Sequence, residues 1–399
     1  MQSSKPASVA IIALSQVAAL SLWFSASAVV PSLVAEFGLS NFVQAAFTGA
    51  VQVGFVIGCL VSALLGLADR IDPRRFFAAS AAIGAGANAL LLVVDPGSNG
   101  ALLLRVATGV CMAGVYPVGM KLASTWAKGD MGLMVGLLVG ALTLGSASPH
   151  LFNAFGGVNW RITLATASVS ALAAAILIGF SGLGPNRAPA PRFDPHYVLT
   201  AWRELPLRLA NFGYLGHMWE LYAMWSWILA FWTAIAVARG LGDKVPPFMA
   251  FAALAVGGVG CVIAGWMADV VGRTAITIAA MMISGACALA IGPAADGPVL
   301  LIGALTLIWG ASIVADSAQF SACVTELVPI EYTGTAVTLQ TALGFLLTMA
   351  SIRSVPVWLA HWGWTFAFMP LAVGPALGSL AMWRLRRHPD AVKLARGAR

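Results

Sequence analysis

The chain has 399 residues, of which 60% are hydrophobic and only 9% are charged. A soluble domain carries roughly a quarter charged residues, so this composition excludes a soluble globular protein. The net charge of +7 does not indicate a nucleic-acid-binding protein, because the basic residues lie between apolar runs and not on a polar domain. The cysteines lie inside apolar runs without CxxC spacing and are expected to be small buried residues: Cys59, Cys111, Cys261, Cys287 and Cys323.

Apolar runs long enough to cross a bilayer recur along the whole chain. Such a crossing needs about 20 residues in a helix, whose backbone satisfies its own hydrogen bonds in lipid. The runs also lack the strict alternation of a membrane β-barrel. We therefore predict an all-α membrane protein with twelve transmembrane helices, at Val9–Ala35, Phe42–Leu64, Phe76–Val94, Ala101–Trp126, Leu133–Phe155, Ile162–Gly182, Leu209–Ala238, Phe248–Ala268, Ala275–Ala295, Val299–Val324, Ala336–Leu359 and Trp364–Trp383.

The first run begins like a signal peptide, with Lys5 before it and a small-residue stretch at Ser25–Ala28. It continues apolar to Ala35, so we expect it to remain as the first span. With this span present, 16 of the 22 Lys and Arg residues fall on the side that holds both termini. The positive-inside rule then predicts that both termini are cytoplasmic.

An internal repeat divides the chain into two halves. The loop after the second span reads LGLADRIDPRRF from Leu65, and the loop after the eighth reads GWMADVVGRT from Gly265. Asp69 and Asp269 are 200 residues apart, about half the chain. We predict an N-terminal six-helix bundle at 1–183, a Pro- and Arg-rich cytoplasmic linker at 184–208, a C-terminal six-helix bundle at 209–385 and a basic cytoplasmic tail at 386–399 that contacts lipid headgroups.

The duplicated loop resembles a signature of the major facilitator superfamily, G-x-x-x-D-x-x-G-R. The residues that carry the resemblance are Gly265, Asp269, Gly272 and Arg273 in the second copy, and Gly66, Asp69, Arg70, Arg74 and Arg75 in the first. The first copy departs from the pattern, with Leu65 at the leading Gly and Asp72 at the later one. The resemblance implies a bacterial secondary transporter in which this loop acts as a latch on the cytoplasmic gate; anchoring of loops is the alternative.

Two further stretches bear on the resemblance. The fourth span carries Arg105 and Gly109 in the R-x-x-x-G arrangement of the family. Arg105 lies near the expected outer surface, where its side chain can extend to the headgroups. The fifth span is Gly-rich but lacks the GP pair of the family's antiporters, so the resemblance does not decide between exchange and co-transport.

Ionisable residues within the spans are the candidates for function, because a charge facing lipid costs at least about 2.5 kcal/mol. His217 and Glu220 are three residues apart and share one face of the seventh span. Glu220 lies near the expected midplane, where transporters bind solute between their halves. We predict proton coupling by Glu220, His217 and Asp316; a permanent structural pairing of Glu220 is the alternative.

Two cations within the spans, Lys121 and Arg353, are candidates for solute contact. Lys121 and Asp316 lie at matching depth in the fourth and tenth spans, which suggests either a contact between the halves or an anion contact at Lys121. Arg353 is the preferred anion anchor, since a guanidinium binds carboxylate or phosphate in bidentate fashion. Further candidates for lining the solute site, for which packing or interhelical hydrogen bonding is the alternative role, are Trp219, Tyr222, Gln319, Asn153, His150 and Gln52.

Motifs of other protein classes do not occur in the sequence. There is no Walker loop, no HExxH or Cys/His cluster and no GxSxG, so we expect no ATP-driven pump, no metal site, no cofactor and no enzyme. The hypothesis is a monomeric secondary transporter of the bacterial inner membrane that moves a small organic or inorganic anion with protons by alternating access. The alternative is a proton-driven exporter of hydrophobic or cationic compounds. The partners are thus a solute, protons and lipid, without nucleic acid.

Overall fold

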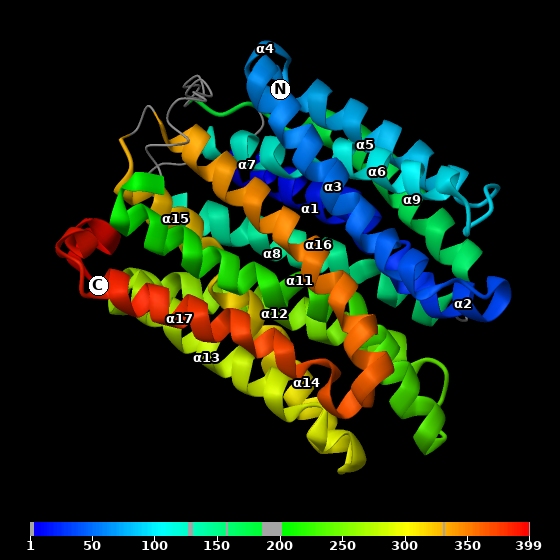
Figure 1. The fold of residues 1–399 in the computed structure, drawn as a ribbon. Helices are drawn as coiled ribbons and strands as arrows, with labels where there is room; N and C mark the ends of the chain where they lie inside the picture. Colours follow the sequence, from blue (N-terminus) through cyan, green and yellow to red (C-terminus); the bar gives the residue numbers. More distant parts are fainter. Residues whose placement is uncertain (1–3, 127–130, 157–158, 186–201, 330–331, 399) are drawn as a thin grey trace. The chain divides into compact units, whose positions relative to one another are not determined.

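The computed structural model describes residues 4–126, 131–156, 159–185, 202–329 and 332–398. Every regular element within these segments is helical (Figure 1). The elements are α1 (Lys5–Phe24), η1 (Ser27–Val29), α2 (Val30–Phe37), α3 (Asn41–Leu65), α4 (Leu67–Arg70), α5 (Pro73–Leu90), α6 (Asn99–Met112), α7 (Tyr116–Ser124), α8 (Met131–Phe155), α9 (Trp160–Leu177), η2 (Ile178–Phe180), α11 (Leu205–Arg239), α12 (Val245–Val271), α13 (Arg273–Ala290), η3 (Pro293–Asp296), α14 (Val299–Ala315), α15 (Ser317–Leu327), α16 (Thr333–Ala367), η5 (Met369–Ala372), α17 (Val373–Arg386) and η6 (Pro389–Gly397).

All twelve predicted spans coincide with helices, which confirms the all-α membrane fold. Ten helices of the described segments are long and apolar enough to cross a membrane. The third and twelfth predicted spans, at α5 and α17, lie outside that set, and α17 itself has only 14 residues. α16 runs through the eleventh span and bends at Gly363, whose φ of 66° is the left-handed conformation that glycine adopts without strain.

The fourth and tenth spans are each built from two helices. α6 ends at Met112 and α7 begins at Tyr116, with Pro117 in its first turn, where the missing proline N–H leaves no helical bond to break. α14 ends at Ala315 and α15 begins at Ser317, so that Asp316 alone separates them. Interruptions at corresponding places in two repeats mark the region where transporters expose backbone and polar groups to solute.

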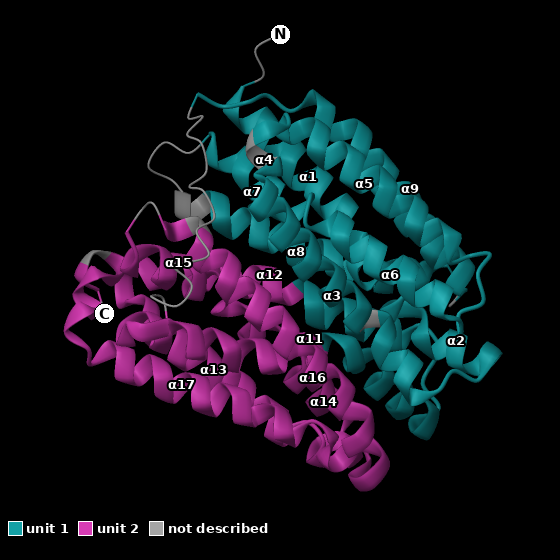
Figure 2. Cartoon of the chain, turned by 45° about the horizontal axis from the view of Figure 1, so that its top comes forward, with its two compact units in different colours: residues 1–189, 225–255 teal, residues 190–224, 256–399 magenta. Residues whose placement is uncertain are grey.

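The structure divides into two compact units, residues 1–189 with 225–255 and residues 190–224 with 256–399 (Figure 2). α11 and α12 are each divided between the two units. The predicted bundle boundaries, 1–183 and 209–385, remain a prediction. Most of the predicted linker lies outside the described residues, since the structure leaves out 186–201.

Glycines bring helices into backbone contact inside each unit. In the first unit, a Cβ atom added at Gly54 of α3 or Gly109 of α6 would collide with the backbone of the facing helix. In the second, Gly257 and Gly260 of α12 meet α14 in the same way, and Gly216 of α11 meets α17. Small residues at such contacts allow the close approach that holds helices together in lipid. This gives a physical reason for the glycine of the R-x-x-x-G arrangement.

A polar contact ties α2 to α9 at one end of the first unit. Glu36 accepts hydrogen bonds from Trp160 Nε1 at 2.6 Å and from an Arg161 Nη atom at 2.9 Å. The Arg161 guanidinium also lies 4.2 Å from the centre of the Trp160 ring. The bond from Trp160 and the bond from Arg161 lower the pKa of the Glu36 carboxyl below its ordinary value of 4.5. The contact therefore favours the ionised carboxylate.

We predict opposite effects for two Gly-to-Ala substitutions. Gly109→Ala forces a methyl group against the α3 backbone and should destabilise the protein by about 1–3 kcal/mol. Gly86→Ala on α5 meets nothing within 4 Å and should leave stability unchanged or raise it by about 0.5–1 kcal/mol. Thermal unfolding of the purified variants measures both effects. Equal midpoints for the two variants would contradict the proposed packing.

The Glu36 contact predicts a pH dependence with a defined sign. Because folding lowers the pKa of Glu36, the ionised contact stabilises the fold above pH 4.5 and its contribution is lost as the pH falls through the folded pKa. The unfolding midpoint of wild type should exceed that of Glu36→Gln at pH 7, and the difference should shrink below pH 4.5. A difference independent of pH would show that charge plays no part.

Candidate functional site

His217 and Asp316 form a buried pair in the second unit. Nδ1 of His217, on α11, lies 2.8 Å from Oδ1 of Asp316, at the junction of α14 and α15. The two side chains are only 2% and 1% exposed. His217 Nε2 and Asp316 Oδ2 have no hydrogen-bond partner among the described residues. Each side chain thus keeps one polar atom available for a proton, a water molecule or a solute.

Aromatic rings surround this pair. The ring centre of Phe320 lies 5.4 Å from that of His217, and the ring centre of Tyr214 lies 6.1 Å from it. Tyr214 and Phe320 also contact each other edge to face at 6.0 Å. A Cβ atom at Gly344 of α16 would collide with the Tyr214 ring, so the glycine makes room for it. The pair therefore sits in an apolar shell that strengthens its electrostatic interactions.

Glu220 occupies a second buried position one turn further along α11. Its carboxylate accepts hydrogen bonds from Ser284 Oγ of α13 at 2.8 Å and from Trp309 Nε1 of α14 at 2.7 Å. It is 1% exposed. Both donors are neutral, and an ionised carboxylate in such surroundings is expensive to keep. Binding a proton removes that charge, so the position is suited to proton uptake and release.

The first unit holds polar side chains of a different kind. Gln16 of α1, Gln52 of α3, and Ser146 and His150 of α8 are buried, and their side-chain polar atoms have no hydrogen-bond partner among the described residues. α1 contacts both of the other helices. Trp23 of α1 packs against Phe55 of α3, and Gly145 of α8 lies close to the backbone of α1. Buried polar atoms almost always bond to something. These four side chains therefore have hydrogen-bonding capacity that water or solute can satisfy.

Arg105 serves the architecture of the first unit. Its guanidinium donates to the backbone carbonyls of Phe47, Leu22 and Trp23 at 2.7–3.2 Å, and to Ser25 and Asn88 at 3.2 and 3.3 Å. It is 0% exposed. The expectation that Arg105 extends to the outer headgroups is wrong, because its side chain points inward to carbonyls that α1 and α3 present. These bonds occupy its donors, which removes it from the candidates for anion binding.

The remaining predicted residues fall into separate places. Asn153 donates to the backbone carbonyl of Ala28 at 3.0 Å, Trp219 donates to that of Pro370 at 3.2 Å, and Tyr222 stacks at 5.0 Å against Phe345. These three have structural contacts. Lys121 is half-buried on α7, and Arg353 is exposed on α16. Their predicted role in anion binding stays a prediction, as does a contact between Lys121 and Asp316.

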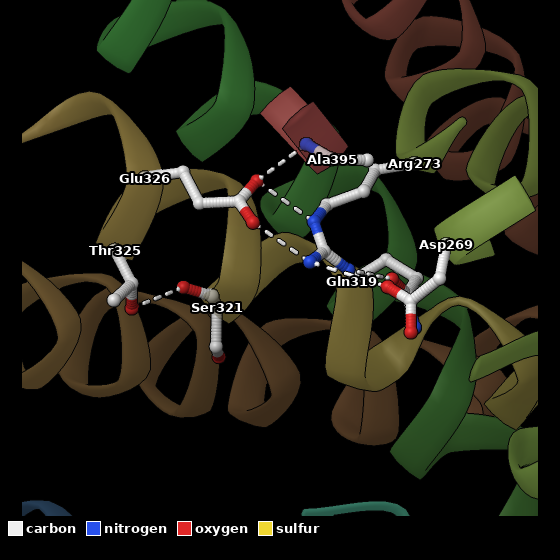
Figure 3. Close-up of polar contacts among 7 residues, drawn as sticks. All are labelled: Asp269, Arg273, Gln319, Ser321, Thr325, Glu326 and Ala395. Atoms are coloured by element: carbon white, nitrogen blue, oxygen red, sulfur yellow. Dashed lines mark hydrogen bonds and ion pairs between the residues drawn. The ribbon is translucent and has the colours of Figure 1, made fainter. Parts of the chain in front are cut away.

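The second signature loop builds a charged network within the second unit (Figure 3). Arg273, the first residue of α13, forms a bidentate pair with Glu326 at 2.7 and 2.8 Å. It also donates to Gln319 Oε1 at 2.7 Å and lies 3.6 Å from Asp269. Gln319, predicted to contact solute, is thus a partner of Arg273. The network joins the end of α12, the start of α13 and most of the length of α15.

The first signature loop also leads into a helix, α5, but it begins that helix with other residues. Asp72 caps α5 by accepting a hydrogen bond from the Arg74 backbone N–H at 2.9 Å, and its carboxylate pairs with the Arg74 side chain at 2.8 Å. Gly272, at the equivalent place, precedes α13 with a φ of 108°. Asp and Gly can each stand before a helix, for different reasons. The Asp72 side chain accepts a backbone hydrogen bond at the start of α5. Gly272 adopts the positive φ that precedes α13. The Asp69 side chain lies outside the described residues. Arg70 and Arg75 are exposed, and Gly66 ends α3.

Comparisons with known proteins place the chain in a family. A profile described as Major Facilitator Superfamily matches residues 12–352. The chain belongs to this superfamily of transporters. No curated protein matches it significantly.

Solved structures of the superfamily share its fold at low identity. One is the proton:xylose symporter XylE bound to 6-bromo-6-deoxy-D-glucose, with a TM-score of 0.67, 15% identity and 96% of each chain covered. Another is a point mutant of the nucleoside transporter NupG, with a TM-score of 0.73 and 12% identity over 94% of this chain and 99% of that one. At such identity the likeness establishes the architecture of this transporter and not its solute.

Sequence reasoning missed several residues of this transporter's site. Trp309 and Ser284, which hold Glu220, lie in apolar helices where nothing distinguishes them from packing residues. Gln16 is the most polar side chain of the first span, and that signal was available. Glu326 follows the tenth predicted span, and its pairing with the signature Arg273 was not deducible without knowing which helices are neighbours.

We predict that the Trp309 bond to Glu220 stabilises the second unit. Trp309→Phe keeps an aromatic ring but removes the N–H donor, and a buried acceptor left without its hydrogen bond costs about 1–3 kcal/mol. The unfolding midpoint should fall accordingly. The matched control is Trp266→Phe on α12, because Trp266 is 72% exposed. Equal midpoints for the two variants would mean that the bond contributes nothing.

Proposed function

We propose that this chain moves a small organic or inorganic anion across the bacterial inner membrane together with protons, by alternating access of its two halves. The observation that carries the proposal is the pair of buried acid sites in the second unit, His217 with Asp316 and Glu220 with its neutral donors. Titratable groups buried within membrane helices mark proton relays and ion pathways.

The solute side of the proposal rests on the first unit and on two cations. The polar atoms of Gln16, Gln52, Ser146 and His150 can bond hydroxyl, carbonyl or carboxylate oxygens. Lys121, on α7 of the same unit, is the cation that we propose for the anionic group, and Arg353 of the second unit stays an anion anchor proposed from the sequence alone. Arg105 is excluded because its donors are already bonded. A small carboxylate that also carries hydroxyl or carbonyl groups fits this combination.

Of the two similar solved structures, XylE supports the proposed coupling to protons, and neither supports a particular solute for this chain. XylE is described as a proton:xylose symporter and NupG as a nucleoside transporter, and both carry uncharged, hydrogen-bonding solutes. We further propose that both termini face the cytoplasm, as the distribution of Lys and Arg favours, and that the protein works as a monomer.

An exporter of hydrophobic or cationic compounds is the second candidate. Tyr214 and Phe320 pack against the ring of His217, which pairs with the Asp316 carboxylate. A cation can bind to a carboxylate and to the faces of aromatic rings at once. In this alternative, the compound and the proton compete for the same acid.

Proton flux in proteoliposomes separates the hypotheses. Vesicles containing pyranine receive acetate, lactate, succinate, citrate, inorganic phosphate, xylose, uridine or ethidium. We expect lumen acidification on addition of a carboxylate or phosphate, reduced at least about tenfold in Glu220→Gln and in Asp316→Asn, since each change removes a carboxyl group that can carry a proton. Asp296→Asn, an acid of η3 outside the spans, is the matched control and should retain the flux.

Each other outcome has a definite meaning. Proton release driven by ethidium, without response to anions, would favour the exporter. A response to xylose or uridine alone would overturn the anion preference and keep proton coupling. Solute uptake without proton movement, or unchanged flux in both acid variants, would overturn the coupling sites.

A further inference from the structure

The segment that follows α17 docks on the second unit. η6 (Pro389–Gly397) packs against α15, with Ala391 and Leu394 fully buried and Ala395 nearly so. Val392 and Lys393, between them, are exposed. This three-residue alternation gives η6 one buried apolar face toward the unit and one exposed face, which carries Val392 and Lys393. The predicted tail at 386–399 is therefore, in its described part, an ordered element as well as a basic one.

A backbone donor completes the Arg273 network from this segment. The N–H of Ala395 donates to Glu326 Oε2 at 3.0 Å, the same oxygen that accepts from Arg273 Nε at 2.8 Å (Figure 3). Oε1 of Glu326 accepts from an Arg273 Nη atom. The carboxylate thus holds the start of α13 and the docked segment simultaneously, at the last turn of α15.

Ala395 adopts an unusual conformation to make this bond. Its φ of 44° is in the left-handed region, and among the described residues it is the one non-glycine with positive φ. For a residue with a Cβ atom that conformation carries strain, which persists only where surrounding contacts impose it. The strain, the buried apolar face and the shared carboxylate indicate that the docking is specific.

A second contact anchors the same region. An Nη atom of Arg386, at the end of α17, donates to Thr274 Oγ1 at 3.3 Å, next to Arg273 on α13. Arg387 stacks 3.8 Å over Trp383 at that end of α17. The chain therefore enters η6 from a position already fixed beside α13. The end of α17 and η6 together thus reach from the start of α13 to the end of α15.

We propose that η6 is an intramolecular clamp that holds the end of α15 to the start of α13 and thereby restrains the movement of α15. α15 is the helix whose other end meets the His217–Asp316 pair. Docked, the clamp fixes Glu326 in its bond to Arg273. When η6 is released, α15 remains held by Arg273 and by its own apolar contacts. This inference does not depend on the solute or on proton coupling, and its test uses neither.

Limited proteolysis measures the docking. Trypsin cleaves after Lys393, but the next residue, Leu394, is buried while η6 is docked. In detergent, release of the peptide that begins at Leu394, followed by mass spectrometry, should be about tenfold faster in Ala395→Pro, which removes the N–H and cannot adopt positive φ. Ala395→Gly relieves the strain and should slow release about threefold. Thr325→Ala is the control, because Thr325 bonds to Ser321 of its own helix and points away from η6 (Figure 3).

Cysteine alkylation measures the restraint on α15. Cys323 lies buried on α15, whereas Cys111 lies on α6 in the first unit. In a chain that ends at His388, alkylation of Cys323 by N-ethylmaleimide should rise about tenfold, as expected when a restraint on the order of one backbone hydrogen bond is lost. Alkylation of Cys111 should not change.

The proposal is overturned by any of three results. Release from Ala395→Pro at the wild-type rate would mean that the bond to Glu326 does not hold η6. An unchanged rate at Cys323 in the shortened chain would mean that η6 covers α15 without restraining it. Equal acceleration at Cys111 and Cys323 would show a general loosening of the protein and no clamp on α15.

Discussion

A polar side chain buried among apolar helices has no water to bond, so its partner must come from another helix. This constraint decides which helices are held together. Arg105 binds carbonyls of α1 and α3. Glu220 joins α11 to α13 and α14. Glycines allow the close approach that such bonds require, as at the α3–α6 contact. Where a partner is missing, as at Gln16 and His150, the atoms are candidates for solute or water.

The two units share an architecture and differ in chemistry. Each has an interrupted helix, a glycine contact between its equivalent helices and a signature loop that begins the next helix with a cap. In the first unit, the buried cation Arg105 donates its hydrogen bonds largely to backbone carbonyls. The second unit buries carboxylates instead. The two units thus share features of helix packing, while each carries its own buried polar groups.

The span positions could be predicted from hydropathy because burial in lipid demands long apolar helices. The pairing of buried residues could not be predicted in the same way. His217 and Glu220 share a face of α11, but they select different partners, Asp316 and Trp309. Which helix faces α11 is a tertiary fact. Arg105 shows the same limit, since its depth along the helix was deducible and the direction of its side chain was not.

α15 connects the two polar centres of the second unit. Its 11 residues span about 16 Å, from Asp316 at one end to Glu326 at the other. Between them, Gln319 accepts a hydrogen bond from Arg273, so α15 contacts that guanidinium at two places along its length. A short helix held at both points moves as a rigid body. A displacement of α15 relative to α13 would therefore stretch the bonds of Arg273, and those bonds oppose a rearrangement of the His217–Asp316 pair that requires such a displacement.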